Sequence, residues 1–282
     1  MDTLLSSGPL RDAAIYYLTV ILTCEGARYV ADQVFDKKGK AHRFIIEFLA
    51  TLQITTTVYE NAVIDIHLGR KAFAFTLFTM GLVFALCNRN AYGSPLGPIE
   101  KIVFGKINVS DFLMAISAQL LAGYCAYQFA SKIWLNTFVD SEIHYDVYEM
   151  FQTCAFNHKY SIYLHLAFEL VGTFIVRHVL TSVTTKYTDS RVSFYFPAFF
   201  MAMVFTLTVT FVGDQALDPL VASTLFFGCR GLDFQHFVLI YWVAPTVGWL
   251  LSAYYDNSNQ ESAKKRANKE KKLERKKSKK NN

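Results

Sequence analysis

The same three landmarks occur twice along this chain, in the same order and at nearly the same spacing. A glutamate within an apolar segment comes first, at Glu47 and again at Glu169. A proline preceded by a capping residue follows, 48 residues later in the first half (47 to 95) and 50 later in the second (169 to 219). A pair of residues three positions apart then marks the closing segment of each half: Gln119 and Ala122, Pro245 and Gly248. The chain is therefore predicted to be an internal duplication.

Apolar stretches of membrane-spanning length recur in both halves. Apolar residues make up 52% of the 282, with 25 Phe and 16 Tyr. Six segments are predicted to span a bilayer: 44–64, 72–88, 112–134, 162–183, 194–213 and 236–255. A seventh hydrophobic helix, 13–34, carries Glu25, Arg28 and Asp32, so it either spans the membrane or lies in the interface.

Two short segments look like helix starts placed at the end of a membrane span. Ser94-Pro95-Leu96 and Asp218-Pro219-Leu220 each combine an N-capping side chain with a proline suited to the first helical position. The helices that they open, 95–105 and 219–228, are too short to cross a hydrocarbon core of about 30 Å. We expect two half-helices that fold back into the membrane, with their positive ends meeting at the midplane of a pore.

The repeat also predicts how the halves are oriented. Each half holds an odd number of spans, so the two halves are inverted relative to each other. Basic residues flank one side of the predicted spans: Lys37, Lys38, Lys40, Arg43, Arg89, Lys101, Lys106, Lys186 and Arg191. The acidic connection between the halves lies on the other side. Arg70 and Lys71 are exceptions, since they are basic residues on that same side. By the positive-inside rule, the basic side and the C-terminus are cytosolic.

The positive net charge belongs to the C-terminal tail. The last 27 residues hold 11 of the 28 Lys and Arg residues and 4 of the 23 Asp and Glu residues. The positive net charge is therefore no evidence for a nucleic-acid-binding domain. The tail ends with Lys279 and Lys280 two residues before the terminus, which resembles a dilysine signal read by coat machinery for return to the endoplasmic reticulum.

Paired half-helices, a repeated membrane glutamate and an inverted arrangement together resemble the aquaporin (major intrinsic protein) family. The extra N-terminal helix, the stretch Glu47 to Gln53 and the run Phe237 to Pro245 are most similar to its unorthodox aquaporin-11-like branch, the intracellular superaquaporins. The resemblance implies an all-α membrane fold of six transmembrane helices in a 3+3 inverted repeat, assembled as a homotetramer. The predicted parts are an N-terminal helix and basic linker (1–41), two repeats (42–135 and 162–255), an acidic connecting loop (136–161) and a basic cytosolic tail (256–282).

The two pore motifs depart from the family pattern. They stand where the family has two Asn-Pro-Ala motifs, and neither keeps the asparagine whose amide donates to the central water. Ser94 can donate or accept a hydrogen bond, whereas an ionised Asp218 only accepts. An ionised Asp218 would attract cations, while a protonated one could donate. Both states remain open.

The resemblance also assigns a selectivity filter and the supports of the half-helices. Val221 stands where the family's filter has an arginine, and Thr206, Gln215 and Ala74 fall near the other filter positions. The constriction should then be wide and lack a fixed positive charge, which suits glycerol and hydrogen peroxide as well as water. Glu47 and Glu169 would accept hydrogen bonds from backbone amides of the re-entrant loops.

Other polar residues are expected to be structural. His165 and Glu169 share a helical face, but no second histidine pair accompanies them, so we expect a packing pair and no metal or cofactor site. Cys154 and Cys229 fall on the non-cytosolic side, where a disulfide could form. His144 and Asp146, in the polar connection, are expected to be solvated.

These observations predict a passive channel for water and small neutral solutes, without enzymatic chemistry. One alternative is a non-conducting structural or interaction protein whose degenerate motifs have closed the pore. A second is a cation pathway through Asp218. A third is a membrane enzyme that uses His165 and Glu169.

Overall fold

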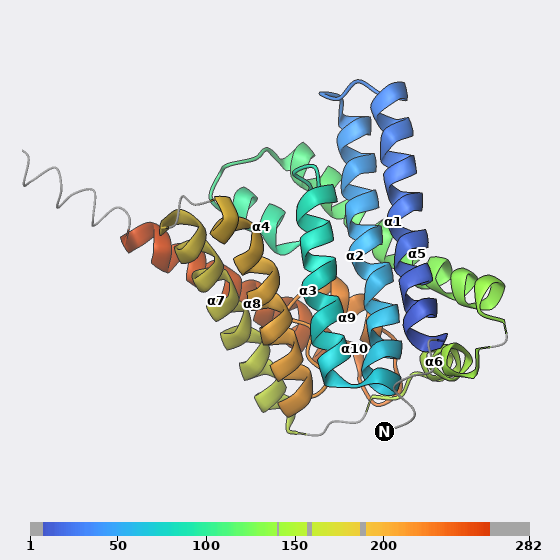
Figure 1. Ribbon diagram of the computed structural model, residues 1–282. Helices are drawn as coiled ribbons and strands as arrows, with labels where there is room; N and C mark the ends of the chain where they lie inside the picture. The colour runs from blue at the N-terminus through green and yellow to red at the C-terminus, as the bar shows by residue number, and fades with distance from the viewer. Residues whose placement is uncertain (1–7, 140, 157–159, 187–189, 260–282) are drawn as a thin grey trace, which may run out of the picture.

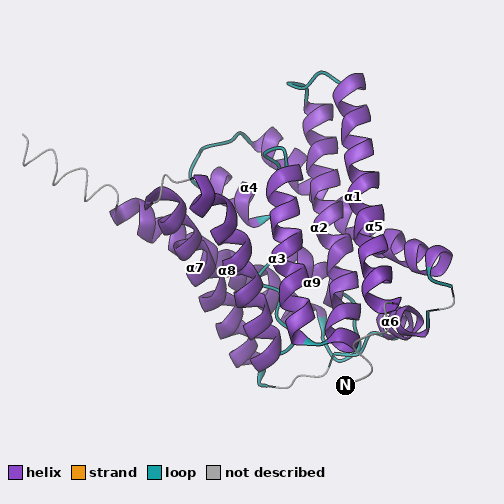
Figure 2. Cartoon of the chain, in the orientation of Figure 1, coloured by secondary structure: helices purple, strands orange, loops and turns teal. Residues whose placement is uncertain are grey.

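The computed structural model describes residues 8–139, 141–156, 160–186 and 190–259, and nearly all of them lie in helices or the turns between them (Figure 1; Figure 2). The one strand-like contact within these ranges is a parallel bridge between Ala155 and Arg230. The predicted signal at Lys279 and Lys280 lies outside the described residues. The prediction of an all-helical fold is confirmed.

The helices are grouped below by the two predicted repeats. The first half holds α2 (Lys40–Leu68), α3 (Arg70–Cys87), α4 (Leu96–Val103) and α5 (Val109–Thr137). The second half holds α7 (Ile162–Lys186), α8 (Ser190–Phe211), α9 (Pro219–Phe226) and a closing helix (Phe234–Asn259). The closing helix starts as α10 (Phe234–Val238) and continues through a π-helical turn, η2 (Leu239–Val243). Two further helices, α1 (Gly8–Val34) and α6 (Glu142–Gln152), lie outside the halves.

Five helices are long and apolar enough to cross a membrane: α3, α5, α7, α8 and the closing helix. Their outward faces carry large exposed apolar side chains such as Phe75, Tyr163 and Phe199, as expected for contact with lipid. The sixth predicted span, α2, is less apolar because it carries several polar residues, and these are buried against neighbouring helices. The buried polar residues in its middle are Thr51, Gln53, Thr55, Thr56, Thr57 and Glu60.

Small residues let the helices within each half approach closely. On α5, Ala118, Ala122, Ala126 and Ala130 are fully buried at four-residue spacing, and α2 packs extensively on this helix. In the second half, a Cβ at Gly248 would lie 2.0 Å from the Leu170 carbonyl oxygen of α7. The repeated small residue of the sequence therefore marks a close helix crossing.

The N-terminal helix α1 lies beside α2 along its length (Figure 1). At one end, the Tyr16 hydroxyl donates to the Thr56 carbonyl (2.9 Å). At the other end, Asp32 lies 2.8 Å from His42. Because α1 is joined to α2 by a short loop, the two helices run antiparallel. At 27 residues, α1 is about 40 Å long, enough to cross a bilayer.

The acidic connection between the halves contains a helix, α6, that was not predicted. Its His144 is buried, and the imidazole lies 2.7 Å from the Ser141 hydroxyl and 3.2 Å from the Glu60 carboxylate. Glu60 also accepts from the Trp134 indole (2.9 Å). The expectation that His144 is solvated is therefore wrong, since an amphipathic helix turns it inward; Asp146 is exposed as expected.

Candidate functional site: the meeting point of the half-helices

The second half-helix begins as its sequence predicts. Asp218 is the N-cap of α9 in an extended conformation, and Pro219 occupies the first helical position. One carboxylate oxygen of Asp218 accepts from the backbone N–H groups of Leu220 (2.8 Å) and Val221 (3.0 Å). Two otherwise free amides of the first turn are thereby satisfied, which leaves the other carboxylate oxygen available.

The first half-helix begins one residue later than its sequence predicts. Helix α4 starts at Leu96, with Pro95 already in helical conformation and Ser94 before it. The Ser94 hydroxyl oxygen lies 3.3 Å from the Leu96 N–H, a longer contact than those made by Asp218. Gly93 has a φ of +66°, and a Cβ there would lie 2.6 Å from the Ile54 side chain, so only glycine suits this turn.

The two half-helix starts meet directly. The Ser94 hydroxyl donates to the second carboxylate oxygen of Asp218, across 124 residues of sequence. Asp218 is half-buried at this point. We call this contact the junction. When Asp218 is ionised and takes the Ser94 proton in this hydrogen bond, the pair has only acceptor capacity left.

Glu47 holds the loop that leads into α4. Its two carboxylate oxygens accept from the backbone N–H groups of Tyr92 and Gly93, both at 2.9 Å. The Gln119 amide donates to Glu47 (2.7 Å) and to the Ser94 carbonyl (3.1 Å). A buried carboxylate thus has three donors that compensate its removal from water.

Glu169 occupies the equivalent place in the second half. It is fully buried and accepts from the N–H groups of Ala216 (2.8 Å) and Leu217 (2.9 Å). Leu217 has a φ of +53°, which is uncommon for a residue other than glycine. The carboxylate therefore holds a strained loop in place just before Asp218.

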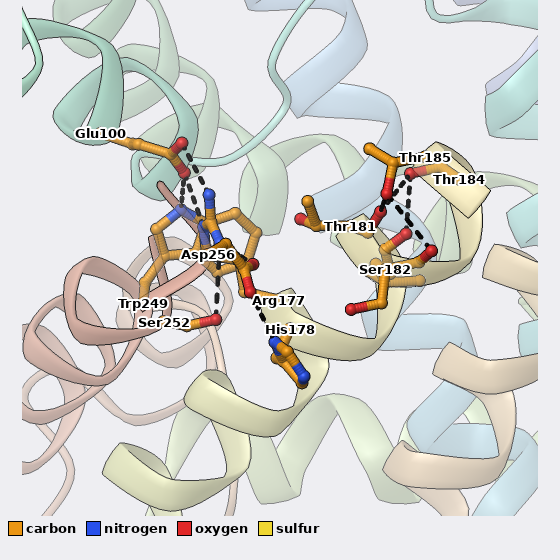
Figure 3. A network of polar contacts seen from close by, with 11 residues as sticks. Glu100, Arg177, His178, Thr181, Ser182, Thr184, Thr185, Trp249, Ser252 and Asp256 are labelled. Carbon is orange, nitrogen blue, oxygen red and sulfur yellow. Dashed lines mark hydrogen bonds and ion pairs between the residues drawn. The ribbon is translucent and has the colours of Figure 1, made fainter. Parts of the chain in front are cut away.

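Each half-helix is also held by the opposite half, six residues after its junction residue. The Thr224 carbonyl of α9 accepts from the Tyr59 hydroxyl of α2 (2.6 Å). Glu100 of α4 forms a two-fold ion pair with Arg177 of α7, with both distances 2.9 Å (Figure 3). The two halves are thus bonded to each other on both sides of the junction. No pattern in the sequence predicts these two contacts.

Arg177 connects α4 to the end of the closing helix as well. Its guanidinium lies 2.8 Å from Asp256, which in turn lies 2.7 Å from His178 (Figure 3). The Trp249 indole donates to Glu100 (2.7 Å). Arg177 is only 8% exposed, so this ion pair is poorly screened by solvent.

The predicted filter residues lie on separate elements of the structure. Gln215 precedes α9 and is buried, with its amide nitrogen 2.6 Å from a His165 ring nitrogen. Val221 is in the first turn of α9, while Ala74 lies on α3 and Thr206 on α8, two helices that pack together. The Thr206 hydroxyl donates to the Ala202 carbonyl of its own helix (2.7 Å).

His165 and Glu169 have different partners in the structure. Glu169 bonds the loop before α9, whereas His165 contacts Gln215. No group of three or more potential metal ligands occurs among the described residues. The geometry of this pair is therefore that of loop support.

A disulfide joins the segment that follows α6 to the segment that follows α9. It links Cys154 and Cys229, whose Cα atoms are 4.8 Å apart. Beside it, the Phe156 N–H donates to the Arg230 carbonyl (2.7 Å) and the Arg230 N–H donates to the Cys154 carbonyl (3.0 Å). The disulfide that the sequence left open thus fixes the connection between the halves against the second half-helix.

Comparison with known proteins places this geometry in a family. No family model matches the sequence. The chain is 32% identical over 271 residues to a Caenorhabditis elegans protein named aquaporin-10, covering 95% of this chain and 93% of that one. It is 26% identical over 239 residues to aquaporin-11 of Homo sapiens, covering 83% and 84%.

A solved structure shares the fold. The aquaglyceroporin from Plasmodium falciparum aligns with a TM-score of 0.55 and 16% identity, covering 77% of this chain and 95% of that one. A sequence relative above 30% identity over almost the whole length and a matching membrane fold agree with the junction of two half-helices. This chain belongs to the aquaporin family.

Proposed function

We propose that this chain is a passive membrane channel for water and small neutral solutes, and that its pore passes the junction of Ser94 and Asp218. The observation that carries the proposal is the direct bond between the two half-helix starts. The positive ends of both helix dipoles converge there. Such a midpoint favours the carboxylate and offers its free lone pairs to solutes that donate hydrogen bonds.

The junction also bears on which solutes cross. Water, glycerol and hydrogen peroxide all carry O–H donors and can satisfy an acceptor-only midpoint. We assign the filter to Ala74, Thr206, Gln215 and Val221. With valine in the first turn of α9, this filter has no cation of its own to repel or orient a solute, which favours passage of solutes larger than water.

We further propose an orientation in which the C-terminus is cytosolic and α1 is a seventh span with its N-terminus on the opposite side. Three observations support it: the basic residues on one side, the antiparallel packing of α1 on α2, and the Cys154–Cys229 disulfide on the side predicted to be non-cytosolic. An acceptor sequon added to the N-terminus should be glycosylated in microsomes. An unmodified sequon there would contradict a seventh span.

The remaining proposals concern assembly and location. We propose a homotetramer, as the family resemblance implies, located in the endoplasmic reticulum, with Lys279 and Lys280 read by coat machinery. Replacing both lysines by serine should move the protein beyond the endoplasmic reticulum in cells. Unchanged localisation would remove the role of the dilysine.

The channel proposal is tested by stopped-flow light scattering on proteoliposomes. Vesicles with the wild-type protein should shrink faster in an osmotic step than empty vesicles. Ser94→Phe should reduce the rate to that of empty vesicles because the ring fills the junction. Ser117→Phe is the matched control, since Ser117 is exposed on the outer face of α5.

Three outcomes would contradict the proposal. Wild-type shrinkage no faster than that of empty vesicles, together with no glycerol or peroxide flux, would favour the non-conducting alternative. Full water flux in Ser94→Phe would remove the pore from the junction. An ionic current that is lost in Asp218→Asn would favour a cation pathway instead.

A further inference from the structure

A cavity of about 270 Å³ opens at the end of the bundle where α2 and α5 begin. Its walls come from the start of α2, the loop between α3 and α4, and the start of α5. The lining residues that matter here are Lys37, Arg43, Glu47, Arg89, Tyr92 and Asp111. The cavity is separate from the junction but reaches the loop that carries Ser94.

Three cationic side chains line the cavity, and they differ in the ion pairs that they make. Arg89 is held by α1, through ion pairs with Asp32 (2.6 Å) and Glu25 (3.1 Å). Arg43 is 45% exposed and makes one longer ion pair with Asp111 (3.3 Å). Lys37 is exposed and makes no salt bridge within the described part of the chain. Lys37 and Arg43 can therefore turn toward an anion.

The start of α2 adds to this preference for negative charge. Helix α2 runs for 29 residues, and its N-cap, Gly39, supplies no side-chain hydrogen bond to the first turn. The amides of that turn and the positive end of the helix dipole lie beside the cavity. An anion would find backbone donors there as well as the two side chains.

Part of the cavity wall is apolar. Ile46, Ile107, Met114 and Ala115 line the cavity together with the cations. A wall that is partly basic and partly apolar, at the end of membrane-spanning helices, matches a phospholipid better than a free ion. The phosphate would contact the cations while the glycerol and upper acyl chain cover the apolar residues.

We propose that this cavity binds the phosphate group of an anionic phospholipid. In the proposed orientation the lipid comes from the cytosolic leaflet. The site reaches Glu47 and Tyr92. The Tyr92 N–H donates to the Glu47 carboxylate, and Tyr92 lies two residues before Ser94 in the loop. Occupancy would therefore steady the loop that positions the first half-helix.

Native mass spectrometry of the purified full chain tests the binding, with phosphatidylserine as the probe and phosphatidylcholine as the reference lipid. Lys37→Gln/Arg43→Gln should weaken phosphatidylserine binding about thirtyfold, at about 1 kcal/mol for each basic residue and 1.4 kcal/mol for each tenfold. Lys71→Gln/Lys132→Gln is the control, because it removes the same charge from exposed residues on other parts of the surface. That control should leave binding within about twofold of wild type, since neither residue lines the cavity.

Three results would overturn the proposal: equal losses in both double variants, wild-type retention of phosphatidylserine no better than of phosphatidylcholine, or displacement of the lipid by inorganic phosphate at a similar concentration. The last result would identify a site for a free anion. If the first double variant fails to fold, Lys37→Gln alone should weaken binding about fivefold, because it removes one cation and no ion pair. The readout is binding, so it does not depend on whether the pore conducts.

Discussion

Replacing Arg177 with methionine removes the ion pair that joins the two halves on one side of the junction. Arg177 makes two contacts of 2.9 Å to Glu100 and one of 2.8 Å to Asp256. The side chains of the two carboxylates are 16% and 10% exposed, so both would remain nearly buried without their cation. Removing one partner of a buried ion pair lowers the unfolding free energy by about 3–5 kcal/mol. We expect Arg177→Met to lower the free energy of unfolding by that amount.

The assay is denaturant unfolding of the purified protein in detergent, followed by tryptophan fluorescence. Arg70→Met is the control, because the pair of Arg70 with Asp65 is 42% exposed on the arginine side and should contribute less than about 1 kcal/mol. A second variant, Arg177→Met/Glu100→Gln, should recover part of the loss because fewer unpaired charges remain. A cost for Arg177→Met no larger than that of Arg70→Met would refute this reasoning.

Two further changes probe the packing and the covalent connection of the second half. Gly248→Ala should lower the unfolding free energy by about 1–3 kcal/mol, because its Cβ would lie 2.0 Å from the Leu170 carbonyl oxygen. Gly26→Ala is the control: its Cβ would meet no atom within 4 Å, so it should be neutral or stabilising. Equal effects of the two variants in the same unfolding assay would contradict the close helix crossing. Cys229→Ser should lower the unfolding free energy by about 2–4 kcal/mol and abolish the mobility difference between reduced and unreduced protein on gels, whereas Cys125→Ser should keep that difference. A mobility difference that persists in Cys229→Ser would contradict the pairing with Cys154.

The half-helices could be predicted because their signals are local. Asp218 and Pro219 act as a cap and a first helical residue whatever surrounds them, and α9 begins where they predict. Ser94 belongs to the same pattern, yet α4 begins one residue late. The Ser94 hydroxyl donates to Asp218 in addition to its long N-capping contact with its own helix. This hydrogen bond depends on a residue 124 positions away.

The contacts between the halves could not be predicted from the sequence. Glu100 and Arg177 are 77 residues apart, and no periodic pattern relates them. The polar connection around His144 predicts a solvated side chain, but α6 turns His144 inward, where its imidazole contacts Glu60. The disulfide depended on two distant loops meeting, a condition that spacing alone does not reveal.

The central claim is that the two half-helix starts touch. It is tested most directly by replacing Ser94 and Asp218 with cysteines and by mapping disulfides with mass spectrometry under mild oxidation. The account predicts a 94–218 disulfide and a water flux that falls on oxidation and recovers on reduction, with no such change in either single variant. Absence of that cross-link, in a double variant that folds and keeps the Cys154–Cys229 bond, would contradict the account.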